Sequence, residues 1–151
     1  MAFHLEWEIE GDKQLSRRLR TLEKWPKDLT GPFRTASTNL KKIFEAEVFD
    51  TRGRVIGEQW KRLSPATVAR KARSGYPSDP LIATGAMKGS FRTIVTSDSA
   101  VIGNTAEYFK YHQSNKPRAK LPRRVMMKIG NNQKTMVVRV FQEHLRKFIV
   151  K

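Results

Sequence analysis

The chain has 151 residues and no cysteine, and 30 Lys and Arg residues against 14 Asp and Glu give a formal net charge of +16. This length fits one domain over residues 1–151 with a single core, and the lack of cysteine excludes disulfides and thiolate zinc sites. No apolar run approaches the roughly 18 residues that span a bilayer, and the N-terminus lacks the pattern of a secretion signal, so we expect a soluble protein made in a cytosol.

The first fifty residues predict a strand followed by two helices. Apolar and polar side chains alternate from residue 3 to residue 10, which indicates a half-buried strand that ends at Gly11. Asp12 is placed to cap a helix over residues 12–25, and a longer helix runs from residue 30 or 31 to about residue 49. The strand has Phe3, Leu5, Trp7 and Ile9 on one side and His4, Glu6, Glu8 and Glu10 on the other.

The remaining residues predict short elements between loops. Ser64 and Pro65 begin a short helix, and a final helix runs from about Asn132 to about Val150. Between them we expect strands at 90–96 and 100–104 joined by a tight turn, and a short helix or irregular turn at 107–113. We expect mobile loops near 51–59, 74–80 and 114–124. The fold class is therefore α+β, with an N-terminal strand and helical hairpin, a small antiparallel sheet and a C-terminal helix.

Motifs for catalysis or metal binding are missing from the sequence. The three histidines, at positions 4, 112 and 144, are far apart, and no nucleophile-elbow sequence occurs. A metal-dependent nuclease needs several converging carboxylates, and the five acids after residue 52 are scattered among basic residues. We therefore expect neither an enzyme nor a metal or cofactor site.

The positive charge is concentrated in the later part of the chain. Residues 1–52 hold 10 Lys and Arg against 9 Asp and Glu, residues 53–151 hold 20 against 5, and residues 110–128 hold seven cations and no acid. A surface of one sign is tolerable when nucleic acid, an acidic partner or lipid head groups lie opposite it. The proline-punctuated loop at 116–124 is either a solvated surface loop or a contact for phosphate or acidic neighbours. Its few aromatics argue against stacking on single-stranded nucleic acid.

Three segments, taken in order, carry a family resemblance. They are Gly57-x-x-Trp60-x-x-Leu63-Ser64, then Leu81-x-x-Thr84-Gly85 with Ser90, then Tyr108-x-x-x-His112-Gln113 followed by Pro122-x-Arg124. Over about residues 40–130 the chain resembles the phage virion morphogenesis (tail completion) family. It departs from that pattern at Ser114-Asn115, where a glycine is usual, and at Val125, where an aromatic is usual.

The motif residues have physical interpretations of their own. Trp60 and Leu63 are spaced to be buried together, and Gly85 permits a tight turn or a positive φ. Thr84 and Ser90 are able to brace that turn. His112 and Gln113 either hydrogen-bond the loop after them or line a subunit contact, and we favour the first.

The resemblance implies a structural or assembly protein of a tailed phage or tail-like particle, located in the virion and synthesised in the host cytoplasm. It implies a homo-oligomeric ring, with a hexamer as one candidate size, that completes the head-proximal end of the tail and helps to join head and tail at the neck. Partners would be the tail tube or terminator, the connector and, non-specifically, DNA in the channel, with no membrane. A stand-alone basic nucleic-acid-binding module is the alternative. The residues expected to contact a subunit, a partner or DNA are Lys110, His112, Gln113, Lys116, Arg118, Lys120, Arg123, Arg124 and Lys128.

Overall fold

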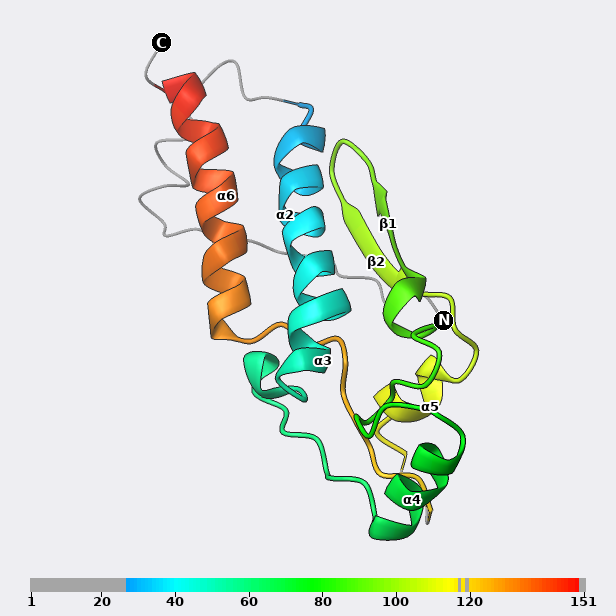
Figure 1. The fold of residues 1–151 in the computed structure, drawn as a ribbon. Coiled ribbons are helices and arrows are strands. Elements are labelled where there is room, and N and C mark those ends of the chain that lie inside the picture. Colours follow the sequence, from blue (N-terminus) through cyan, green and yellow to red (C-terminus); the bar gives the residue numbers. More distant parts are fainter. Residues whose placement is uncertain (1–26, 117, 119, 150–151) are drawn as a thin grey trace.

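The computed structural model describes residues 27–116, 118 and 120–149, and its first element is a long helix (Figure 1). This helix consists of α2 (Thr30–Lys42), the π-helical segment η1 (Ile43–Glu47) and α3 (Val48–Asp50), which follow one another without a break. The Asp28 carboxylate accepts a hydrogen bond from the Thr30 amide at 2.8 Å, so it satisfies one of the free donors at the helix start. The helix predicted over residues 30–49 is confirmed.

Helix α2 lies between the C-terminal helix α6 (Asn131–Ile149) and a β-hairpin (Figure 1). Phe33 of α2 meets Phe141 of α6 edge to face, with ring centroids 4.9 Å apart. The hairpin joins β1 (Phe91–Val95) to β2 (Ala100–Asn104) in antiparallel register, as predicted. This two-stranded sheet and the helices around it confirm the α+β class.

Short elements make up the end of the molecule away from the hairpin turn. They are the 3-10 turns η2 (Arg54–Ile56) and η3 (Lys88–Ser90) and the helices α4 (Pro65–Arg73) and α5 (Phe109–Gln113). The Ser64 hydroxyl accepts a hydrogen bond from the Thr67 amide at 3.3 Å, which is the predicted N-cap. The predicted strand at 3–10 and helix at 12–25 lie outside the described residues, and the mobility of the three loops stays a prediction.

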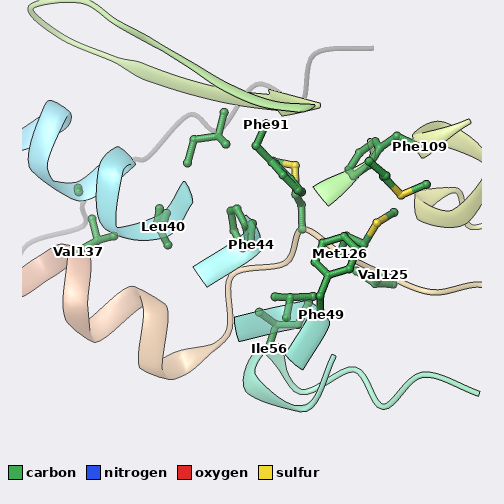
Figure 2. Packing of buried hydrophobic residues seen from close by; sticks show 14 of the residues in the cluster. Leu40, Phe44, Phe49, Ile56, Phe91, Phe109, Val125, Met126 and Val137 are labelled. Carbon is green, nitrogen blue, oxygen red and sulfur yellow. The ribbon is translucent and has the colours of Figure 1, made fainter. Parts of the chain in front are cut away.

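One apolar core runs from α6 to α5, and residues 125–127, an extended segment that follows the loop at 114–124, complete it. Figure 2 shows Val125 and Met126 beside Phe49, Ile56 and Phe109, residues that come from distant parts of the sequence. Met126 has no exposed surface, and Val125 and Met127 are also buried. The sequence had assigned no element and no buried role to this segment.

Candidate interaction surface

Trp60, from the first motif, connects the turn after α3 with the extended segment. Its indole Nε1 donates a hydrogen bond to the Val125 carbonyl oxygen at 2.7 Å, and its ring meets Phe49 edge to face at 5.5 Å between centroids. The side chain is buried, as predicted, whereas Leu63 is only half-buried. This part of the motif is therefore scaffold.

The close packing of the turn after α3 against Trp60 requires a glycine at position 53, which no sequence motif had predicted. The φ of Gly53 is +84°, and a Cβ there would lie 1.8 Å from the Glu58 carbonyl oxygen and 2.7 Å from the Trp60 ring. Gly57 and Gly85 also have positive φ, +74° and +81°, but a Cβ at either would meet no neighbour within 4 Å. The positive φ predicted for Gly85 is confirmed, and among the described glycines with positive φ only Gly53 is also confined by contact.

The second motif forms a braced turn before the hairpin. The Thr84 hydroxyl accepts a hydrogen bond from the Ala86 amide at 3.4 Å, and the Ser90 hydroxyl donates to the Ala86 carbonyl. The buried Asn104 side chain, at the end of β2, donates to the Met87 carbonyl at 2.7 Å. The predicted bracing role of Thr84 and Ser90 agrees with these bonds.

Gln113, at the end of α5, holds the extended segment by three hydrogen bonds. Its Oε1 accepts from the Met126 amide at 2.9 Å and from the Met127 amide at 3.2 Å, and its Nε2 donates to the Met127 carbonyl at 2.6 Å. The side chain of Gln113 has a bracing role, as favoured, but its partners Met126 and Met127 lie beyond the predicted loop at 114–124.

His112 faces the interior rather than a surface. It is buried, its carbonyl oxygen accepts a hydrogen bond from the Arg124 amide at 3.1 Å, and its Nδ1 has no hydrogen-bond partner among the described residues. Burial lowers the pKa of His112, and the Arg124 guanidinium lowers it further. A hydrogen bond with the Pro122 backbone has the opposite effect and raises this pKa. This hydrogen bond joins His112 to the loop after α5, as the favoured interpretation predicted, and a contact of His112 with a subunit, a partner or DNA stays a prediction.

Arg124 was wrongly predicted as part of a contact surface. Its side chain is only 5% exposed, and its Nε and Nη2 donate to the Lys61 carbonyl oxygen at 3.2 and 3.0 Å. Burial lowers the pKa of its guanidinium. A buried cation must be hydrogen-bonded to be tolerated, and the Lys61 carbonyl meets that need. Lys128 differs from it, because its exposed ammonium group pairs with the Glu58 carboxylate at 2.6 Å.

Five cations of the predicted surface are exposed and have no ion-pair partner among the described residues. They are Lys110, Lys116, Arg118, Lys120 and Arg123. The Arg118 guanidinium carbon lies 4.2 Å from the centre of the Tyr111 ring, and Lys110 Nζ lies 5.2 Å from it. This pair of contacts places positive charge around one exposed aromatic. We call these five residues the basic surface.

The model of the phage virion morphogenesis family matches residues 11–146. The chain belongs to this family. Phage virion morphogenesis proteins have structural and assembly roles in the particle, which associates this chain with the virion and gives no support to an enzymatic role. The match extends beyond residues 40–130, where the motifs had shown the resemblance. Comparison with curated proteins and with solved structures gives no match.

The described residues contain neither a membrane-spanning helix nor a cluster of metal ligands. Within them, no helix is long and apolar enough to cross a membrane. No group of three or more His, Asp or Glu side chains in the same part of the chain is placed to hold a metal ion.

Proposed function

We propose that this protein completes the head-proximal end of a phage tail and helps to join tail and head as a homo-oligomeric ring, without catalysis. Family membership supports the assembly role, and the basic surface supports the finer statement. Five unpaired cations repeated around a ring multiply the local positive potential, which makes assembly costly unless anions lie nearby. Acidic surfaces of the tail tube, the terminator or the connector, and DNA phosphates in the channel, are the partners of suitable charge.

Four of the five cations of the basic surface lie on a loop whose two ends are anchored to the rest of the fold. The bond between the Arg124 amide and the His112 carbonyl, 3.1 Å long, closes the loop between these residues. Gln113 and Arg124 tie its two ends to the core through Met126, Met127 and Lys61. Anchored ends reduce the conformational freedom that a contact with a neighbour would have to remove. This geometry suits a loop that docks on another subunit.

A charge reversal confined to the exposed loop tests the proposal. The variant carries Lys116→Glu, Arg118→Glu, Lys120→Glu and Arg123→Glu, and it keeps the buried Arg124. We expect a folded protein with a nearly unchanged urea midpoint, because exposed substitutions alter stability little. In a phage that lacks the parent gene we expect free heads and tails by electron microscopy and a strong loss of infectious particles.

A second variant with the same change in charge serves as the matched control. It reverses four exposed cations outside the basic surface, Arg70 and Arg73 on α4 and Lys134 and Arg139 on α6. We expect this control to join heads and tails far better than the loop variant. Normal particles from the loop variant, or equal loss from both variants, would refute the proposal.

The same five cations also suit a stand-alone DNA-binding module, and a salt series separates the two functions. Contact of all five with phosphates predicts a slope of log K against log salt of about −4.5. Useful duplex affinity near physiological salt, without ring formation or copurification with tail proteins, would favour the module. Ring formation by mass measurement with no such affinity would favour the assembly role.

A further inference from the structure

A hollow of about 780 Å³ lies between the hairpin and the residues directly after it. Side chains alternate across a strand, so Phe91 and Ile102 face α2, whereas Ile94 and its register partner Val101 face the hollow. Ile94 is 68% exposed, which is the largest value among the exposed large apolar side chains of the described residues. On the outer side of the sheet, Ile94 is therefore left largely uncovered by the described residues.

Aromatic and cationic side chains complete the lining of this hollow. Tyr108 and Tyr111, at 44% and 38% exposure, border it together with Ile94. Arg92 and Lys110 also line it, and the Arg118 guanidinium lies over the Tyr111 ring. A contiguous apolar surface with a charged rim is typical of a docking site. The rim is basic, which predicts an occupant that is apolar on one side and acidic on the other.

The N-terminal segment of the chain has this composition. Its alternating residues put Phe3, Leu5, Trp7 and Ile9 on one side of an extended strand. The other side carries Glu6, Glu8 and Glu10. Residues 1–12 hold four acids, with Asp12 as the fourth, and no Lys or Arg.

The described chain begins close enough for this segment to reach the hollow. The Leu29 amide donates to the carbonyl oxygen of Ser97, in the hairpin turn, at 2.8 Å. The helix predicted over residues 12–25 would be about 21 Å long, and a five-residue strand is about 17 Å long. These lengths allow the segment, if it turns back along the hairpin, to reach the base where Tyr108 and Tyr111 follow β2.

We propose that residues 3–10 of the same chain lie as an extended strand in this hollow. The side with Leu5 and Trp7 covers Ile94, Val101 and the two tyrosines, and the glutamates face the rim cations. This docking shares Lys110 and Arg118 with the basic surface, but it is tested in the isolated protein and therefore separately from head–tail joining. In this arrangement the glutamates of the N-terminal segment neutralise part of the positive charge around Tyr111.

Because the chain has no cysteine, disulfide trapping gives a direct test. Two double variants, Leu5→Cys with Ile94→Cys and Trp7→Cys with Ile94→Cys, are oxidised and analysed by non-reducing electrophoresis and peptide mass mapping. The control combines Leu5→Cys with Val138→Cys, an exposed position on α6, on the other side of α2 from the hairpin. We expect an internal disulfide in the monomer for at least one Ile94 pair and severalfold less for the control.

Three results would overturn the proposal: no disulfide, equal yields with the control, or disulfide-linked dimers in place of monomers. Dimers would assign the hollow to the segment of a second copy. Circular dichroism of the reduced variants shows that each one is folded, so that a missing disulfide is informative.

A charge reversal then tests the assignment of the glutamates to the rim. In the trapped pair, Glu6→Lys, Glu8→Lys and Glu10→Lys together should lower the yield severalfold. Adding Arg92→Glu and Lys110→Glu should restore part of it. An unchanged yield in the first variant would overturn the predicted contact between the glutamates and the rim cations.

Discussion

Arg123 and Arg124 are neighbours of identical chemistry with opposite surroundings. Arg123 is exposed and has no ion-pair partner among the described residues, whereas Arg124 is 5% exposed and donates twice to the Lys61 carbonyl. The same contrast holds along the acid-free stretch, in which His112 and residues 124–127 are buried whereas the five cations of the basic surface are exposed. A count of charges along the sequence therefore overestimates the charge available to a partner.

The largest expected effect on stability is the difference between alanine substitutions of the two arginines. Arg124→Ala leaves the Lys61 carbonyl without its donors and opens space in the core, so it should lower the free energy of unfolding by about 3 kcal/mol. Arg123→Ala should change it by less than about 0.5 kcal/mol. Urea unfolding of both variants measures the difference. Equal losses of stability in the two variants would contradict the conclusion that only Arg124 contributes to the core.

Gln113→Ala tests whether the Gln113 side chain holds residues 126 and 127 in place. It removes three hydrogen bonds to Met126 and Met127, so the free energy of unfolding should fall by about 2 kcal/mol. Hydrogen exchange at the Met126 and Met127 amides should become faster as well. The control is Gln142→Ala, at an exposed position on α6, for which we expect little change. Unaltered exchange at both amides would show that Gln113 does not hold the segment.

The smallest effect is a dependence of stability on pH through His112. Burial and Arg124 lower its pKa in the folded protein, so the unfolded chain binds the proton more readily. The contribution to stability is complete above the unfolded pKa of about 6.5, and it is lost as the pH falls from there through the folded pKa. Unfolding free energies between pH 7.5 and pH 5 should fall less steeply in His112→Gln. Identical pH profiles for parent and variant would contradict this prediction.

Local signals in the sequence predicted most of the described secondary structure. The N-cap of α4 at Ser64, the hairpin around residues 97–99 and the apolar stripe of α6 depend on neighbours a few residues away. Such short-range physics is visible in a single sequence. The N-cap prediction, for instance, required only Ser64, Pro65 and Thr67.

Contacts between distant residues account for the features that the sequence could not reveal. Val125 is buried because Trp60, 65 residues earlier, donates to its carbonyl, and Arg124 is buried because Lys61 accepts its hydrogen bonds. Gly53 is confined by Glu58 and Trp60 through a turn whose shape no local motif specifies. The run of apolar residues at 125–127 was a signal of burial, but the neighbouring cations indicated a surface instead.

The π-helical segment η1 places one extra residue in a single turn of the long helix. Before it, Ala36 and Leu40 lie beside Ile102 and Val137, and after it Phe49 lies against Trp60. Because the wide turn absorbs the extra residue, the α-helical turns on either side keep these faces toward their partners, and losing one residue between 43 and 47 would convert η1 into a regular α-helical turn. Related chains that are one residue shorter here should therefore keep both sets of contacts, with an uninterrupted α-helix in place of η1.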